Sequence, residues 1–264
     1  LTNEQLKRSI QSSHSELQIL GMEVISNRQI SDLLPCIIEN IKNADIYRAS
    51  ILALHNFNSE NVESLIKEKL VEKKNSIDKT NLGLIKALGE FGSANSVELL
   101  IHLINDTKQD IIMDSVLRSL KKITAQTKVF QLHYEQFWKL LQNRFGYAYV
   151  ILRYIHLIQS FENNVLLLDH FQAKFNREIR RIFIILEILY PDKIVQTYIH
   201  KLQSTDRSVI SNVLEIIENQ YPDTIKQILM PLIDETSIVE KLNSGSIFLD
   251  SVIQSANDII IDLA

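Results

Sequence analysis

Seven histidines are the residues best suited to chemistry in this chain, because imidazole is a common metal ligand and titrates near neutral pH. Two histidines on one helix face would need a spacing of about three to five residues to share a metal ion. No two of them have that spacing, so we expect no histidine metal site. The seven are His14, His55, His102, His133, His156, His170 and His200.

The chain also lacks the usual patterns of nucleophilic catalysis and nucleotide binding. Its single cysteine, Cys36, follows Pro35 in an apolar stretch, which predicts a buried and unreactive thiol. The phrase "GEFG" at Gly89–Gly92 is typical of a helix end and not of a dinucleotide-binding loop. No serine stands in a G-x-S-x-G elbow. We therefore expect no catalytic residue and no cofactor.

Basic side chains are the one set that we expect to face a partner. They fall on stretches that we predict to be the second helix of each pair in a stack of paired helices. In such a stack the second helices usually line the concave side. An aligned cationic stripe there could contact phosphates. Acidic residues on the same helices and a net charge of −4 favour ordinary solvated helix faces over a nucleic-acid surface. The set is Arg48, Arg118, Lys121, Lys122, Arg180, Arg181 and Arg207.

Trp138 stands in an aromatic cluster with Tyr134 and Phe137. Aromatic side chains at helical spacing are most often core residues, which predicts a buried Trp138. The alternative is a wall that faces a ligand in the middle of the chain.

A repeated phrase indicates the elements that position these residues. The chain reads "YPDKIVQTYIHKL" from Tyr190 and "YPDTIKQILMPLI" from Tyr221, 31 residues later. Each copy follows an apolar helical stretch, and proline near a helix start costs no intrahelical hydrogen bond. Weaker copies begin at Asp45, Asp78 and Asp110, where an aspartate predicts a helix cap. A period of about 30 to 34 residues indicates stacked helical units.

The composition agrees with helices joined by short loops. Only six glycines and four prolines occur in 264 residues, fewer than the turns of a sheet protein would need. The segment from Lys128 to Phe175 fits the repeat least, which leaves longer or irregular helices or a bend as alternatives there. The predicted helix pairs are 3–12 with 15–27, 31–43 with 46–57, 61–73 with 78–91, 95–105 with 110–125, 132–143 with 146–160, 163–174 with 177–189, 192–203 with 207–219, and 223–233 with 236–262, the last broken near Gly245.

No linker rich in glycine, proline or serine divides the chain, so we expect one domain over residues 1–264. No run of about 18 apolar residues occurs, so we expect no membrane span. The chain begins at Leu1 and ends in "DIIIDLA", and we expect it to be a piece of a longer protein. The phrase "SIFLDSVIQSANDIIIDLA" would leave the C-terminal end apolar, where a finished stack normally carries a polar cap.

The phrase "IKALGEFGSANSVELLIHLIND" resembles the HEAT repeat, in the short form found in phycobilisome-lyase-like proteins. An "ALG" second helix, a glycine turn and an "L-x-x-L-x-x-D" first helix follow one another. The resemblance covers most of the chain through its apolar positions. It implies an all-α, HEAT/armadillo-like fold: a right-handed α-solenoid of about eight stacked antiparallel helix pairs.

A narrower stretch, Arg177–Asp234, is similar to HEAT regions fused to bacterial ATP/ADP-carrier-like or major-facilitator-like membrane proteins. In those regions "NALE-x-L-(D/E)-N" precedes "LPLL(D/E)". Here Asn212–Asn219 and Met230–Asp234 match the two motifs, with departures at Val213 and Ile217. The resemblance implies an accessory domain on the cytoplasmic face of such a membrane protein.

These observations predict a non-catalytic scaffold for a protein partner, or a cytoplasmic accessory or regulatory domain of a larger, transporter-like membrane protein. We expect neither a metal nor a nucleic-acid partner. The alternative is a HEAT-like DNA glycosylase or other nucleic-acid-binding module with a cationic concave face, or a lyase-like protein that handles a chromophore. Trp138 pointing into a cationic groove would favour the glycosylase. An exposed apolar patch, on the groove or at an end of the stack, would favour the scaffold.

Overall fold

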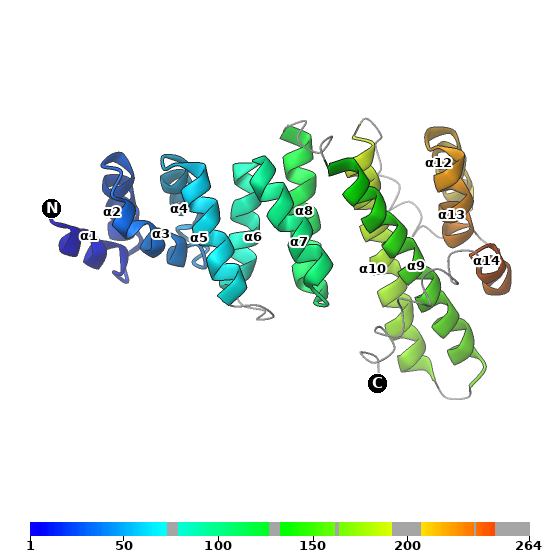
Figure 1. Ribbon diagram of the computed structural model, residues 1–264. Coiled ribbons are helices and arrows are strands. Elements are labelled where there is room, and N and C mark those ends of the chain that lie inside the picture. Colours follow the sequence, from blue (N-terminus) through cyan, green and yellow to red (C-terminus); the bar gives the residue numbers. More distant parts are fainter. Residues whose placement is uncertain (73–78, 127–132, 162–163, 192–206, 235, 246–264) are drawn as a thin grey trace. The chain divides into compact units, whose positions relative to one another are not determined.

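The computed structural model describes residues 1–72, 79–126, 133–161, 164–191, 207–234 and 236–245 (Figure 1). Every regular element in these residues is a helix and none is a strand, which confirms the all-α prediction. The chain divides into two compact units, Leu1–Leu132 and His133–Ala264. The expectation of one continuous domain stays a prediction.

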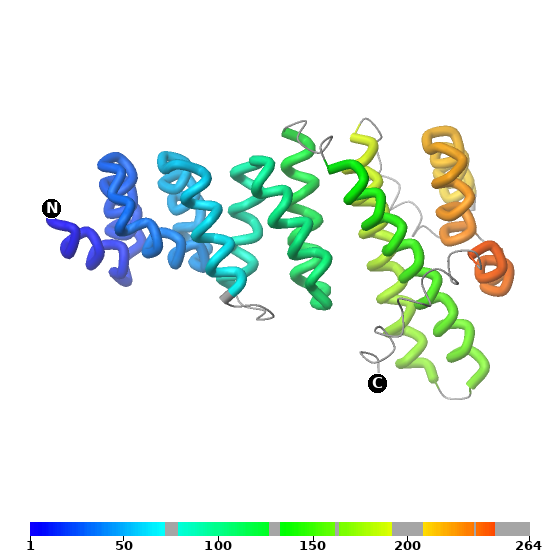
Figure 2. Tube along the Cα trace, in the orientation of Figure 1, coloured from blue at the N-terminus to red at the C-terminus, as the bar shows by residue number. Residues whose placement is uncertain are grey.

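The first unit is built of short helices that contact one another in two rows. Its described helices are α1 (Asn3–Ile10), α2 (Ser15–Asn27), η1 (Ser31–Leu33, a 3-10 helix), α3 (Leu34–Asn40), α4 (Tyr47–His55), α5 (Ser59–Glu72), α6 (Lys79–Phe91), α7 (Ala94–Asp106) and α8 (Asp110–Gln126). Helices α1, α3, α5 and α7 each contact the next member of one row, and α2, α4, α6 and α8 do so in the other. Figures 1 and 2 show how the chain alternates between the rows.

These bounds confirm the four helix pairs predicted up to residue 125, with ends shifted by a few residues. The prediction that Asp45 caps a helix is wrong, because the chain makes a further turn and α4 begins at Tyr47. Its N-cap is Ile46, which makes no side-chain hydrogen bond. Asp110 is the first residue of α8, where a carboxylate still favours the positive end of the helix dipole. Asp78 lies outside the described residues.

Side-chain hydrogen bonds join successive helix pairs at the spacing of the sequence repeat. Each bond connects residues 30 to 34 positions apart, so equivalent places in consecutive pairs are linked. They satisfy polar groups that packing would otherwise leave without a partner. The bonds run from Asn40 Nδ2 to the Ile10 carbonyl (3.1 Å), from Asn56 Nδ2 to Ser26 Oγ (2.6 Å) and from Ser119 Oγ to the Ile85 carbonyl (3.0 Å).

Two glycines of α6 lie where neighbouring helices come closest. A Cβ on Gly83 would stand 2.6 Å from Ile41 Cγ2 and 2.9 Å from the Ile41 carbonyl oxygen. A Cβ on Gly89 would stand 2.8 Å from Ser119 Cβ. Both separations are shorter than real Cβ contacts, which stay above 3.0 Å. The absence of a side chain therefore lets α6 pack directly on the end of α3 and on α8.

The second unit contains two long helices and three shorter ones among its described residues. They are α9 (Tyr134–Gln159), α10 (Val165–Leu189), α12 (Arg207–Gln220), α13 (Asp223–Ile233) and α14 (Ile238–Ser244). Helices α9 and α10 pack against each other as an antiparallel hairpin (Figure 1). Helix α13 contacts α9, α12 and α14, and α14 also contacts α9.

The prediction of four helices between residues 132 and 189 is wrong, because the described residues of this range, 133–161 and 164–189, form only α9 and α10. The sequence predicts a break before Gly146, yet Gly146 lies buried inside α9. One glycine costs a helix only about 1 kcal/mol relative to alanine, and buried Phe145 and Tyr149 beside it fix α9 in the core. The alternative of longer helices in Lys128–Phe175 is confirmed for its described part. Two of the eight expected pairs are therefore a single pair.

The tyrosines that open the two copies of the repeated phrase touch each other. The rings of Tyr190 and Tyr221 pack edge to face, with centroids 5.6 Å apart and an interplanar angle of 82°, a favourable geometry for aromatic pairs. Pro222 is the N-cap of α13, as the proline pattern predicts. The predicted helix 192–203 lies outside the described residues.

Helix α14 ends where the sequence predicts a break. Gly245 is the C-cap of α14, and it packs so closely on Tyr149 that a Cβ there would stand 2.3 Å from the ring. The apolar phrase that follows, residues 246–264, lies outside the described residues. Its role as an exposed end stays a prediction.

Tyr149 should make the second unit sensitive to alkaline pH. Its buried hydroxyl donates a hydrogen bond of 2.9 Å to the Ile228 carbonyl. Burial, aided by the negative charge of Asp234, raises the pKa of Tyr149 above its usual value. Because the folded-state pKa exceeds the unfolded one, stability is intact below about pH 10 and falls above it.

The substitution Tyr149→Phe should remove this titration. Urea unfolding across the alkaline range should show a smaller loss of stability for the variant than for the wild type. At neutral pH the variant should lose about 0.5–1.5 kcal/mol with the hydrogen bond. Parallel pH profiles for the two proteins would contradict the assignment.

Candidate functional site

The predicted basic residues of α4 and α8 are interspersed with acidic groups. Arg48 is exposed on α4 and lines a shallow hollow together with Glu23 and Asp45. On α8, Lys122 Nζ lies 2.5 Å from Glu90 Oε2 on α6. The surfaces around Arg48 and Lys122 therefore carry acidic as well as basic groups.

The other two basic residues of α8 differ in exposure. Arg118 is exposed, whereas Lys121 is half-buried beside Lys122. The charges on this row of helices are therefore mixed, as expected of solvated helix faces. A role for these residues in contacting a partner stays a prediction.

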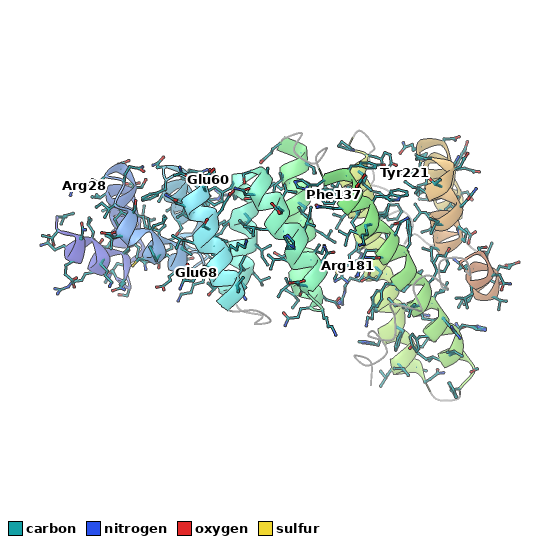
Figure 3. All side chains as sticks on the ribbon, in the orientation of Figure 1. Arg28, Glu60, Glu68, Phe137, Arg181 and Tyr221 are labelled. Atoms are coloured by element: carbon teal, nitrogen blue, oxygen red, sulfur yellow. The ribbon has the colours of Figure 1, made fainter. Side chains whose placement is uncertain are left out.

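In the second unit, the prediction that Arg181 faces a partner is wrong, because its side chain is buried. Arg181, labelled in Figure 3, is only 2% exposed. It donates a hydrogen bond to the buried carboxylate of Glu178 on the same helix. Arg144 Nη1 on α9 lies 3.5 Å from the other oxygen of that carboxylate. The three charges hold α9 and α10 together. Arg180 is exposed, and the side chain of Arg207 lies outside the described part.

Cys36 and Trp138 are both half-buried. Burial, with a smaller effect of Glu39, raises the pKa of the Cys36 thiol, so little of the reactive thiolate forms at neutral pH. Phe137, next to Trp138, is fully buried. The aromatic cluster thus contributes to the core through Phe137, and Trp138 lies at its edge.

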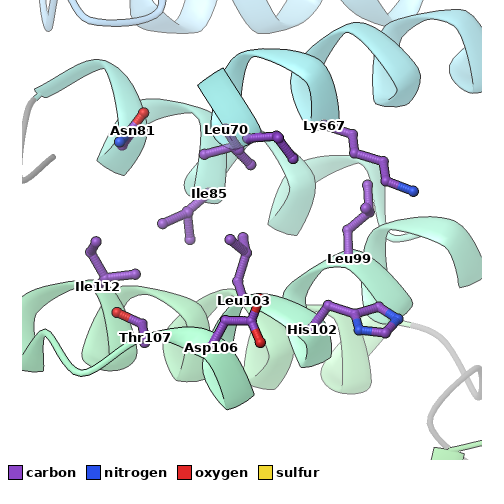
Figure 4. A pocket seen from close by; sticks show the side chains of 11 residues that line it. Lys67, Leu70, Asn81, Ile85, Leu99, His102, Leu103, Asp106, Thr107 and Ile112 are labelled. Atoms are coloured by element: carbon purple, nitrogen blue, oxygen red, sulfur yellow. The ribbon is translucent and has the colours of Figure 1, made fainter. Parts of the chain in front are cut away.

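A groove in the first unit lies between α5 and α7. Its apolar half has a volume of about 310 Å³. In Figure 4, Leu70 of α5 and Ile85 of α6 point toward Leu103 of α7 and Ile112 of α8. Val71, which is 64% exposed, stands at the rim.

An acidic half continues the same groove. It has a volume of about 330 Å³ and shares Lys67, Leu99 and His102 with the apolar half. Figure 4 shows these three side chains together at one end of the apolar half. We name the two halves together the α5–α7 groove. The residues that line only the acidic half are Glu60, Glu63, Ser64, Asn95 and Glu98.

One face of each helix supplies the groove. The lining positions of α5 are 60, 63, 64, 67, 70 and 71, and those of α7 are 95, 98, 99, 102, 103 and 106. Spacings of three and four residues put such positions on a single helix face. The N-terminal halves of both helices line the acidic half, so α5 and α7 run in the same direction.

Glu63 anchors the acidic half. Its side chain is buried, and its Oε1 accepts hydrogen bonds from the hydroxyls of Ser93 and Ser96 in the next helix pair, the latter at 2.7 Å. Ser93 is also the N-cap of α7, because its Oγ accepts from the Ser96 backbone N–H. Glu63 Oε2 has no hydrogen-bond partner among the described residues. A carboxylate is thus fixed in place with one oxygen unsatisfied.

Two exposed side chains frame this carboxylate. Glu60 lies one turn before Glu63 on α5, and Glu98 lies on α7. His102 Nε2 is 3.9 Å from Glu98 Oε1, an exposed contact that solvent screens. Figure 3 marks Glu60 near one end of α5 and Glu68, which does not line the groove, nearer the other.

Within the described part of the chain, no group of histidine, cysteine, aspartate and glutamate side chains could hold a metal ion. His200 lies outside that part. None of the described helices has the length and apolar content that crossing a membrane requires.

Comparisons with known proteins do not assign this chain to a family. Models of protein families, curated proteins and solved structures gave no match.

A second exposed apolar surface lies at the tip of the α9–α10 hairpin. Exposed apolar patches often mark interaction sites, and Leu166 is 86% exposed there. Among the described residues of the tip, no buried polar group comparable to Glu63 accompanies this patch, so it points to no class of ligand. Its side chains are Leu157, Phe161, Val165, Leu166 and Leu167.

Sequence reasoning missed the α5–α7 groove because it placed the binding face on the second helices of the pairs. The groove lies between two first helices. Its signal in the sequence is a stripe on α5 that changes from acidic to apolar along the helix, beside a stripe on α7 in which Leu99 and Leu103 alternate with polar residues. Such a stripe looks like an ordinary amphipathic helix until both helices are seen side by side.

Proposed function

We propose that the chain is a HEAT-type α-solenoid that acts as a non-catalytic scaffold and binds a partner protein in the α5–α7 groove. The two rows of helices in the first unit support the solenoid, since each helix contacts the next one in its own row. The hydrogen bonds between successive pairs support it too, because they follow the repeat period.

The observation that carries the binding function is the α5–α7 groove. It combines an apolar half with polar groups that converge from two helices, the usual make-up of a specific binding site. Leu99 and Leu103 are partly exposed in it, and covering them would remove apolar surface from water. A scaffold needs such a surface and no reactive group.

The proposal extends to an accessory or regulatory domain on the cytoplasmic side of a larger, transporter-like membrane protein. This part rests on the resemblance of Arg177–Asp234. An antibody raised against the chain, used on membrane and soluble fractions of source cells, tests it. A band well above 30.5 kDa in the membrane fraction is expected. A soluble band near that mass would contradict it.

We do not propose the DNA glycosylase alternative, since the basic residues give it little support. Lys122 is paired with Glu90, and Arg181 is buried against Glu178. Trp138 is half-buried beside the fully buried Phe137.

Photo-crosslinking tests the proposed function. A photoreactive amino acid at Val71, on the rim of the groove, should crosslink one protein in source cells, and Leu103→Glu should abolish that product. The matched control is the same photoreactive residue at Leu52, which is exposed on α4 and outside the groove. Products that are the same from both positions, or that survive Leu103→Glu, would contradict binding at the groove.

A further inference from the structure

We propose that the ligand of the α5–α7 groove is a basic amphipathic helix of the partner protein. Its lysine or arginine side chains would occupy the acidic half, and its leucine-like side chains the apolar half. The inference rests on the proposed function and names the chemistry of the segment that the groove selects.

The charge of the groove favours a cationic ligand. The acidic half carries three carboxylates, those of Glu60, Glu63 and Glu98, and the whole groove has a single lysine, Lys67. Complementary charges at such a surface speed association and reject partners of the wrong sign. An acidic segment would therefore be excluded.

Glu63 supplies the second, independent reason. Its side chain is 2% exposed, its Oε1 is held by two serine hydroxyls, and its Oε2 has no partner among the described residues. A buried carboxylate oxygen without a hydrogen bond is costly. An ammonium or guanidinium group would supply a charge-assisted hydrogen bond of the strongest class found in proteins.

The ligand cation is organic. Among the described residues, the carboxylates of the acidic half and His102 do not form a group that could hold a metal ion. A flexible lysine or arginine side chain can instead reach between Glu60 and Glu98 while its stem lies on the apolar surface of Leu99.

The length of the groove matches a helix. Glu63 and Leu70 are seven residues apart on α5, which is about 10 Å along the axis at 1.5 Å per residue. Residues seven apart on a ligand helix are separated by the same distance and lie on one face. A basic residue at position i and a leucine at i+7 would therefore reach the two halves together, as in helix-in-groove recognition.

The C-terminal phrase of this chain does not have this chemistry. Residues 246–264 contain three aspartates and no lysine or arginine. The carboxylates of the groove would repel them, so we assign the groove to a segment of another protein.

Peptide binding tests the inference on the full chain. The probe is a fluorescent helical peptide of about 18 residues, with lysines at i and i+4 and leucines at i+7, i+8 and i+11. The control peptide carries glutamate in place of both lysines. Fluorescence anisotropy should show binding of the basic peptide, weakened by salt, and at least about tenfold weaker binding of the acidic one.

Charge reversal in the groove should invert this preference. The double variant Glu60→Lys/Glu98→Lys should bind the basic peptide at least about tenfold more weakly and the acidic peptide more tightly than the wild type. The matched control is Glu39→Lys/Glu68→Lys, which changes the net charge equally at exposed positions outside the groove and should leave both affinities within about twofold. Circular dichroism of each variant confirms that it is folded.

Two results would overturn the inference. One is equal binding of the two peptides, or no binding of either, by folded protein. The other is the same loss of affinity in the control double variant, which would indicate attraction by net charge alone. If the Val71 crosslink still depends on Leu103 in either case, the proposed function stands and only the basic ligand is wrong. If that crosslink is also absent, both fail.

Discussion

Replacing Glu178 by leucine should lower the free energy of unfolding by about 3–5 kcal/mol. Glu178 is fully buried and contacts both Arg181 of its own helix and Arg144 of α9. Leucine fills a similar volume but removes the carboxylate between two guanidinium groups. Charges inside a protein are expensive to bury, so the cost comes from the loss of this carboxylate as a partner of the two arginines. Urea unfolding monitored by circular dichroism measures the loss.

Arg180→Met provides the matched control. Arg180 is adjacent in sequence but exposed, so its replacement should change stability by no more than about 0.5 kcal/mol. The double variant Glu178→Leu/Arg181→Met should be more stable than Glu178→Leu alone, because it removes one buried charge as well. A loss below about 1 kcal/mol for Glu178→Leu would show that other groups compensate the arginines.

Gly83→Ala should destabilise the first unit by about 1–3 kcal/mol. At an open helix position the same change usually stabilises by about 0.5–1 kcal/mol, because alanine loses less backbone entropy. The expected sign is reversed here because the new Cβ would meet both the side chain and the carbonyl of Ile41. The backbone cannot rotate away as a side chain can, so α6 and α3 must move apart. Thermal and urea unfolding measure the change.

Lys86→Ala on the same helix is the control, since Lys86 is exposed and its loss should stay within about 0.5 kcal/mol. A stabilised Gly83→Ala variant would mean that α6 and its neighbour can separate at no cost. In that case the close approach at Gly83 would not be a determinant of the packing.

The periodic part of the fold could be predicted from the sequence because its signal is repeated. In the first unit, apolar positions recur at helical spacing and glycine or polar residues separate the helices, so both bounds and order follow. The sequence pattern fails where a single residue determines whether a helix continues or ends. Gly146 looks like a break, but the packing of Phe145 and Tyr149 outweighs the weak helix preference of glycine.

The site was less predictable than the fold. Arg180 and Arg181 are the same residue type in adjacent positions. Only the packing of α10 on α9 determines that Arg180 is exposed and that Arg181 is buried against Glu178. The hydrogen bonds of Glu63 could not be predicted from the sequence either, because its partners Ser93 and Ser96 belong to the next helix pair. Contacts across helix pairs join residues about one period apart, and a single sequence does not say which of them meet.

The ring contact between Tyr190 and Tyr221 has a bearing on how such a chain can grow. The two tyrosines occupy the same place in the two copies of one phrase, and their rings pack on each other. A gene duplication of one period would therefore supply a second tyrosine together with the ring that receives it. A chain that lengthened in this way would need no new complementary residue at this contact, because the tyrosine is its own partner.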